Sequence, residues 1–199
     1  MGCSKAKQAE SPEDAVHLLE ASMRDGDFDQ RISLAPKRQR GAIIKLRDTF
    51  KNVKKASDAF YDALDVRFGS DSLPKRPETP DLAASFEARD QNARIEIANQ
   101  ERKDDNSVNL KLKMTRTENE KTGSTNTVEV NCTAIKEDDG WKLYVGSEEN
   151  AESKQQKLIE MLERQIKFFE QGAADVKAGK YQTKIEAIQA FRTQPSGNS

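Results

Sequence analysis

The chain has 199 residues, which suits one domain with appendages or two small domains, and a chain of this size needs no disulfide to hold its core. It is polar, with 35% hydrophobic residues, 34% charged residues and a mean hydropathy of −0.88, but its apolar residues recur periodically, so the sequence predicts a folded protein. Because the net charge is only −1 and no apolar run is long, we expect no nucleic-acid partner and no membrane-spanning segment.

The chain begins with MGCSKAKQ, and this start has three interpretations. In the first, Cys3 is the acylated first residue of a bacterial lipoprotein, and this interpretation requires a hydrophobic leader before the residues given. Alternatively, Gly2 and Cys3 form a myristoylation and palmitoylation pair, although Ala6 stands where that pattern has Ser or Thr. The third interpretation is an ordinary cytosolic start. In all three, residues 1–10 are expected to form a flexible tether.

The residues after this tether predict helices. Ser11, followed by Pro12 and acidic residues, is typical of a helix start, and Gly26 is expected to end that helix. A longer helix is predicted for residues 36–68, because its apolar residues form one stripe: Ile43, Leu46, Phe50, Val53, Phe60 and Leu64. The prolines of FGSDSLPKRPETP end it, and residues 81–89 favour a short helix.

From residue 94 the apolar period changes to two, which is typical of strands. The segments RIEIA, SVNLKLKMT, TVEVNCTA and WKLYV alternate apolar and polar residues, and turn-forming residues separate them. This pattern predicts a four-stranded antiparallel meander with one apolar face. The opposite face, which includes Lys142 and Tyr144, is expected to meet water.

Two helical patterns follow the strands, at residues 154–178 and 183–192. The predicted fold class is therefore α+β, with N-terminal helices packed on the meander and a C-terminal helical extension. The predicted organisation is a tether at 1–10, an α+β domain at 11–146, the helical extension at 147–193 and a disordered tail at 194–199.

Two stretches carry a resemblance to a known superfamily. SPEDAVHLLEASMRDGDFD joins Pro-Glu, an apolar helix and Gly-Asp with an aromatic residue, and AIKEDDGWKLYVG places a Gly-Trp-Lys turn before the last strand. Together with the element order, they make residues 11–146 resemble the nuclear-transport-factor-like α+β cone, including small bacterial envelope lipoproteins of that superfamily. The resemblance implies a cone-like fold with a pocket between sheet and helices. It also ranks a lipoprotein at the bacterial cell envelope, acylated at Cys3, ahead of a cytoplasmic protein.

Residues suited to catalysis are few. His17 is the only histidine and is expected at or near the surface, while Cys132 points inward in its predicted strand and is expected to be a buried thiol. The sequence has no metal-ligand spacing, Gly-rich phosphate loop or GxSxG motif. We therefore expect no catalytic residue, no metal site and no cofactor.

Two sets of residues are candidates for binding. The apolar face of the meander supplies the pocket-lining or core-lining candidates Ile97, Leu112, Val130, Trp141 and Leu143. The basic stretch 37–55 supplies the basic-face candidates Lys45, Lys51 and Lys55. The favoured interpretation of that stretch is a solvated helix attracted to the acidic stretch 10–29, and the alternative is a face for phosphate or anionic lipid. Phe168 and Phe169 are further candidates for contact with a partner.

These observations lead to one functional hypothesis and two alternatives. The hypothesis is a non-enzymatic binding or accessory module at a bacterial cell envelope, which takes a small apolar ligand or a protein partner. The first alternative is a cone-class enzyme that acts on a small apolar substrate. The second is an interaction protein whose apolar stripes at 43–64 and 158–176 pair within the chain or in a homodimer. Membrane contact is expected only through a lipid anchor at Cys3.

Overall fold

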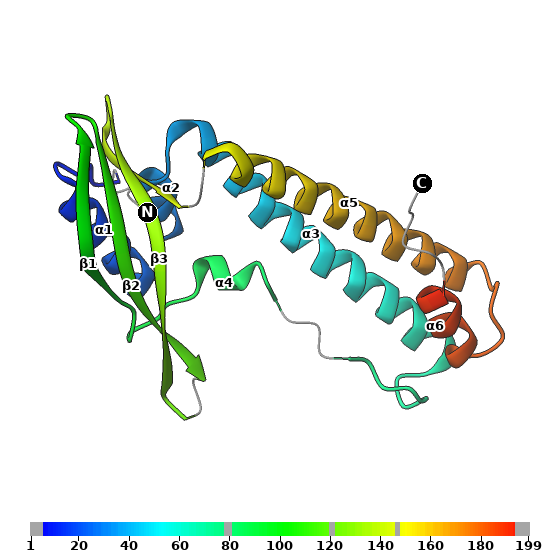
Figure 1. The fold of residues 1–199 in the computed structure, drawn as a ribbon. Coiled ribbons are helices and arrows are strands. Elements are labelled where there is room, and N and C mark those ends of the chain that lie inside the picture. Colours follow the sequence, from blue (N-terminus) through cyan, green and yellow to red (C-terminus); the bar gives the residue numbers. More distant parts are fainter. Residues whose placement is uncertain (1–5, 78–80, 120–121, 146–147, 194–199) are drawn as a thin grey trace. The chain divides into compact units, whose positions relative to one another are not determined.

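The computed structural model describes residues 6–77, 81–119, 122–145 and 148–193, and it confirms the α+β class (Figure 1). Two helices precede a long helix, four strands form an antiparallel sheet, and helices end the described chain. The elements are α1 (Pro12–Asp25), α2 (Phe28–Leu34), α3 (Lys37–Phe68), α4 (Ala84–Glu87), β1 (Arg94–Asp104), β2 (Ser107–Asn119), β3 (Ser124–Glu137), β4 (Gly140–Val145), α5 (Glu148–Lys177) and α6 (Lys184–Thr193). None of the described helices is both long enough and apolar enough to cross a bilayer.

The chain forms two compact units, and each is assembled from two separate stretches. The α+β unit comprises Met1–Ile44 and Ala84–Gln155, and the helical unit comprises Lys45–Ala83 and Gln156–Ser199. This division differs from the predicted boundaries at 11–146 and 147–193. Most of α3 belongs with the C-terminal helices, because its apolar stripe packs on α5 and α6.

The residues before α1 differ from the predicted tether at 1–10. The side-chain amide of Gln30 binds Lys7 in both directions, since it accepts from the Lys7 amide at 2.7 Å and donates to the Lys7 carbonyl at 3.0 Å. Ala9 is 2% exposed, and its carbonyl accepts a hydrogen bond from the Trp141 amide at 3.0 Å. Residues 7–9 are therefore fixed to the α+β unit, and only residues before them remain as a predicted tether.

The start and end of α1 follow the sequence signals. The Ser11 hydroxyl accepts from the Asp14 amide at 3.0 Å, and Gly26 adopts a left-handed φ of 72° directly after the helix. A side chain at position 26 would meet the Glu87 carbonyl, which lies 2.8 Å from the position of its Cβ. Gly26 therefore allows residues 87–89 to approach the end of α1.

The sheet has the order β1-β2-β3-β4, and every pair of neighbouring strands is antiparallel, which confirms the predicted meander. The register places Leu112 opposite Ile97 on one side and Val130 on the other. The first three strands contain 11, 13 and 14 residues, so they run well beyond their predicted apolar segments. Their extensions are polar, which is why periodicity alone did not reveal them.

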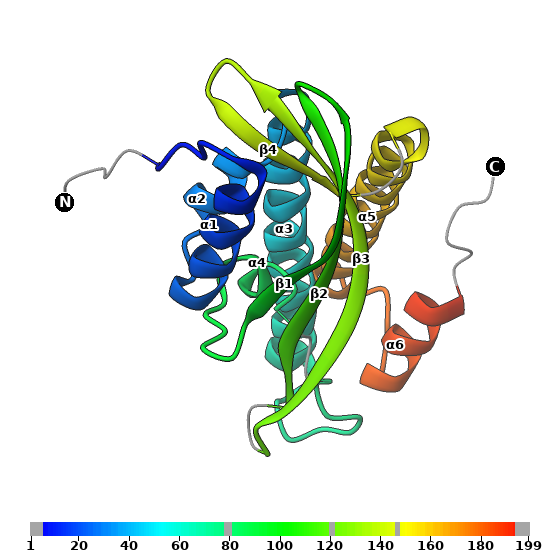
Figure 2. The same cartoon turned by 60° about the vertical axis from the view of Figure 1, so that its left-hand side comes forward.

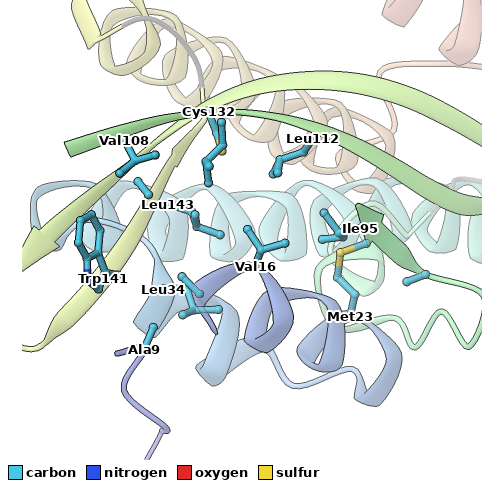
Figure 3. Close-up of a cluster of buried hydrophobic side chains, with 14 residues drawn as sticks. Ala9, Val16, Met23, Leu34, Ile95, Val108, Leu112, Cys132, Trp141 and Leu143 are labelled. Carbon is cyan, nitrogen blue, oxygen red and sulfur yellow. The ribbon is translucent and has the colours of Figure 1, made fainter. Parts of the chain in front are cut away.

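One face of the sheet packs on α1 and α2. Figure 3 shows Val108, Leu112 and Leu143 of the sheet pointing toward the helices, where Val16 and Leu34 lie. These side chains belong to one buried cluster, in which Leu112 is 1% exposed. The apolar side chains of the meander therefore form a packed core with the N-terminal helices.

The opposite face at β4 corrects a prediction. Lys142 and Tyr144, both expected to meet water, are 2% and 0% exposed. The Arg38 guanidinium lies 5.2 Å from the centre of the Tyr144 ring, and the Lys142 ammonium donates to the Asp139 carbonyl at 2.8 Å. The Asp139 carboxylate also accepts from Arg40 at 3.0 Å. The first turn of α3 therefore covers a strand face that alternation assigned to solvent.

In the helical unit, α3 and α5 run side by side in the same direction, as their colours show in Figures 1 and 2. The predicted apolar stripes pack together within the chain over residues 53–64 and 166–176. Their core contains aliphatic side chains and a group of rings: the Phe191 ring of α6 stacks 4.6 Å from Phe60, 4.1 Å from Phe168 and 4.9 Å from Phe169. A buried ion pair adds to it, because the Lys184 ammonium donates to Asp65 at 2.9 Å.

Candidate functional site: an arginine-lined cleft

The predicted apolar pocket is filled by its own side chains. Leu112, Trp141 and Leu143 are buried in the core cluster of the α+β unit, and Ile97 and Val130 are partly buried. None of the three clefts described below is lined by any of these five side chains. Leu112, Trp141 and Leu143 are therefore core residues with Ile97 packed against them, while Val130 is half-buried on β3 outside this cluster.

A polar cleft lies elsewhere in the α+β unit, and we call it the arginine cleft. Its volume is about 440 Å³, and it lies between the C-terminal end of α1, residues 88–92 and the β2–β3 hairpin. Three guanidinium-bearing residues line it from three different segments: Arg31 of α2, Arg89 of the loop and Arg116 of β2. Met23, Asp90, Asn92 and Thr117 also contribute to its walls.

Arg31 is fixed in place by backbone carbonyls. Its Nε and Nη2 both donate to the Ser22 carbonyl at 3.2 Å, its Nη1 donates to Phe86 at 2.8 Å, and its Nη2 also donates to Ala88 at 3.0 Å. Burial lowers the pKa of Arg31, the positive charge of Arg116 lowers it further, and the negative charge of Asp27 acts in the opposite direction without outweighing them. Arg31 thus joins the end of α1 to residues 86–88, and its charge lies close to that of Arg116.

Asp90 is the carboxylate that lines this cleft, and its oxygens are already engaged. They accept from the Thr117 amide at 2.9 Å, the Thr117 hydroxyl at 2.7 Å and the Asn92 amide at 3.1 Å. Burial acts to raise the pKa of Asp90, but these hydrogen bonds and the charge of Arg116 outweigh it and leave that pKa below its ordinary value. Asp90 therefore stays ionised and holds the loop against β2.

Arg89 and Arg116 are exposed, and among the side chains that the structure describes neither lies within ion-pair distance of a carboxylate. Arg116 follows Leu112 and Met114 at intervals of two, so it lies on the same face of the sheet, where the apolar run ends. Its charge therefore lies at the end of the core, beside Arg31. Positive charge that lacks a protein partner in a cleft is typical of a site for anions.

The predicted basic face is not one surface. Lys45, Lys51 and Lys55 are all exposed, but Lys45 forms an ion pair with Glu163 of α5 at 3.1 Å. At about 100° per residue, Lys45 points well away from the direction that Lys51 and Lys55 share. The described ion pairs of residues 37–55 join turn 137–139, α5 or α3 itself, and none of them joins the acidic stretch 10–29.

The remaining candidates have structural positions. His17 is exposed, and Cys132 is a free buried thiol whose pKa burial raises to about 11. Phe168, half-buried, and Phe169, buried, both stack on Phe191 within the helical unit. Cys3 lies outside the described residues, and its acylation stays a prediction. Within the described residues, no three His, Cys, Asp or Glu side chains are grouped to hold a metal ion.

Two further clefts lie on the described surface. One, of about 620 Å³, lies on the polar face of the sheet beside Asn99, Lys111 and Asn131. The other, of about 680 Å³, lies on the helical unit beside Ala63, Val66 and Val176. The first is lined by charges of both signs, Glu101 and Lys111, and so is the second, by Asp62, Arg67 and Lys177, so neither gathers three like charges as the arginine cleft does.

Sequence reasoning missed all three arginines of the cleft. Arg116 could have been found from the sequence, because it follows the inward-facing Leu112 and Met114 at the same interval of two and is charged. Arg31 and Arg89 could not, because their meeting depends on how the loop after α4 returns to the end of α1. That return rests on tertiary contacts such as the Phe28–Phe86 ring pair, with centres 6.1 Å apart.

Comparison with known proteins adds no identification: no protein-family model, curated protein or solved structure gives a significant match to the chain. The resemblance of residues 11–146 to the nuclear-transport-factor-like cone therefore stays a prediction.

Proposed function

We propose that the chain is a non-enzymatic binding module whose α+β unit holds an anionic small molecule in the arginine cleft. The observation that carries the proposal is that three arginine residues line one cleft whose lining carboxylate, Asp90, is already hydrogen-bonded. Guanidinium groups donate pairs of hydrogen bonds to carboxylate, sulfate and phosphate oxygens, so Arg89 and Arg116 suit such a ligand.

This proposal replaces the small apolar ligand with an anionic one. An apolar ligand needs an open apolar cavity. The side chains expected to line that cavity are packed against α1 and α2 instead, as Leu112 at 1% exposure illustrates. The arginine cleft is open and polar, so it favours a charged ligand.

Binding is favoured over catalysis because of Asp90. A general base needs an oxygen free to accept a proton and a pKa near the working pH. Both oxygens of Asp90 accept hydrogen bonds from Thr117 or Asn92, and its pKa lies below its ordinary value. Asp90 is therefore suited to holding the cleft together and not to moving protons.

The test is calorimetric titration of the full chain with sodium sulfate and sodium phosphate at constant ionic strength. We expect Arg89→Gln and Arg116→Gln each to weaken binding about tenfold, the size of losing one charge-assisted hydrogen-bonded pair. Arg102→Gln is the matched control, because Arg102 is 70% exposed, pairs with Asp105 and lies outside the cleft. Absence of binding, or equal weakening by all three substitutions, would contradict the proposal.

Attachment to a bacterial envelope through Cys3 is a separate proposal. It rests on the Gly2–Cys3 start and on the family resemblance, and the arginine cleft does not bear on it. The intact mass of the protein from its own cells tests it: added acyl mass on Cys3 in the membrane fraction is the expected result, and an unmodified soluble form contradicts it.

A further inference from the structure

We infer that the anion held by the arginine cleft is a phosphate monoester in its dianionic form, carried by a small organic molecule. This inference rests on the proposed anion-binding function and names the chemical class of the ligand. It draws on the directions from which the donors come, the charge of the cleft and its volume.

The arginines that line the cleft come from three segments. Arg89 on the loop after α4 and Arg116 on β2 supply most of the available donors. Arg31 on α2 contributes mainly its charge, because four of its five N–H groups already donate to backbone carbonyls. A carboxylate presents two oxygens in one plane, and one guanidinium can satisfy both of them. A phosphate monoester presents three terminal oxygens in a tetrahedral arrangement, which suits donors that approach from three sides.

The charge of the cleft matches a dianion. Its lining residues include three arginines and one aspartate, Asp90, which gives the lining a formal charge of +2, and Asp27, which acts on Arg31 from outside the lining, offsets part of it. A phosphate monoester carries about −1.5 to −2 at pH 7, because its second pKa is about 6. A phosphodiester or a single carboxylate carries one negative charge and would leave a positive charge unmatched.

The volume and the remaining lining indicate a small organic carrier. About 440 Å³ lies in the range of about 300–1,000 Å³ that small-molecule sites occupy, and it exceeds what the phosphate group alone fills. Met23 and Ala88 offer apolar contact, while Gln91 and Asn92 offer amide groups. A short carrier with hydroxyl groups would fit this mixture.

The first experiment compares glycerol 3-phosphate with sulfate at pH 7.5 and pH 5.0, by calorimetry on the full chain. Between these values the phosphate monoester loses about nine-tenths of its dianion, so its dissociation constant is expected to rise about tenfold. Sulfate stays a dianion, so its dissociation constant is expected to change less than threefold. A rise of the same size for both anions would overturn the inference.

Sulfate also controls for titration of the protein. Protein groups that change charge near the cleft act on both dianions alike, so only the difference between the two ligands reports on phosphate. Besides the three arginines, the ionisable residues on the surrounding elements are Glu13, Asp14, His17, Glu20, Arg24 and Asp25 on α1, Asp27 and Asp29 at α2, Asp90 on the loop, and Lys111, Lys113 and Glu118 on β2.

The second experiment compares glycerol 3-phosphate with dimethyl phosphate at pH 7.5. The diester keeps the tetrahedral phosphorus but carries one charge, and we expect it to bind at least tenfold more weakly. Arg116→Gln should reduce this preference, and Arg102→Gln should leave it unchanged. Equal affinity for monoester and diester in the unsubstituted chain would overturn the inference while leaving the anion-binding function intact.

A phosphoserine tetrapeptide separates the two sources of a phosphate monoester. Tighter binding of glycerol 3-phosphate than of the peptide supports the small organic carrier. Tighter binding of the peptide overturns that part and assigns the cleft to a phosphorylated protein. Failure of every anion to bind would instead refute the proposed function, so the two failures are distinct.

Discussion

The two units of this chain hold themselves together by different means. The α+β unit buries mainly aliphatic and small side chains, such as Val16, Leu112 and Ala134, against a hydrogen-bonded sheet. The described residues of the helical unit form no such ladder, and its core joins aliphatic side chains such as Leu64 and Val176 to a group of stacked rings around Phe191. Backbone pairing thus supports the packing in the first unit, whereas side-chain packing that includes this group of rings holds the second. The arginine cleft lies in the α+β unit, where β2 of the sheet forms one of the walls of the cleft.

The largest expected effect is that of Phe60→Ala in the helical unit. Phe60 is 1% exposed, stacks on Phe191 and is the nearest neighbour of Gly172, so its removal leaves a large cavity. We expect a loss of about 3–5 kcal/mol from the free energy of unfolding of this unit. Residue-resolved hydrogen exchange should show lost protection in α5 and α6 while β2 and β3 keep theirs. Equal losses in both units would contradict the comparison.

The matched substitution in the α+β unit is Leu112→Ala. Leu112 is 1% exposed, but Ile97 and Val130 flank it on the neighbouring strands and the ladder stays intact around it. We expect a smaller loss of about 2–3 kcal/mol, since the neighbours can partly fill the space. Urea unfolding followed by the fluorescence of Trp141, the only tryptophan, measures it. A loss larger than that of Phe60→Ala would reverse the order proposed here.

Lys184→Met tests the buried ion pair of the helical unit. The ammonium, 2% exposed, donates to Asp65 and to the Ser72 carbonyl at 3.1 Å. Methionine has a side chain of similar length but leaves both acceptors without that donor, so we expect the free energy of unfolding to fall by about 1–3 kcal/mol. Lys180→Met is the control, because Lys180 is 57% exposed in its pair with Asp175 and should lose less than about 1 kcal/mol. Thermal unfolding that responds equally to both substitutions would contradict this prediction.

The smallest effect, and the one most specific to the arginine cleft, is the pH dependence of Asp90→Asn. The pKa of Asp90 is lower in the folded chain, so the carboxylate stabilises the fold above its ordinary pKa, and this contribution is lost as the pH falls through the lowered value. We expect Asp90→Asn to cost about 1 kcal/mol at pH 7 and to unfold like the unsubstituted chain near pH 2. Urea unfolding at both values measures it. Asp105→Asn, at a 95% exposed side chain, should show no such change, and a constant difference at both pH values would refute the assignment.

The fold was largely predictable because its signals are local. Ser11, Gly26 and the change of apolar period near residue 94 mark boundaries that the structure keeps. What periodicity could not predict depends on contacts between distant residues. Tyr144 follows the polar phase of its strand and is nevertheless buried, because Arg38 at the start of α3 lies over its ring.

The candidate site was less predictable than the fold for the same reason. Arg116 is visible from its strand position, but nothing local to Arg31 shows that its guanidinium will hold the carbonyls of Phe86 and Ala88. The expected pocket also depended on the distance between the helices and the sheet, which the sequence does not show. The helices lie close enough to the sheet for Leu112 and Val16 to fill the space between them.

The interleaving of the two units has a consequence for synthesis on the ribosome. The segments of the α+β unit are complete once residue 155 has emerged, whereas α3 must wait for α5 and α6 before Phe60 and Leu64 find their partners. During that interval the apolar stripe of α3 is exposed beside a unit that can already fold. A chaperone that binds the nascent chain therefore has one defined target, the stretch between residues 45 and 68. This stretch no longer needs the chaperone once the last helix has left the exit tunnel.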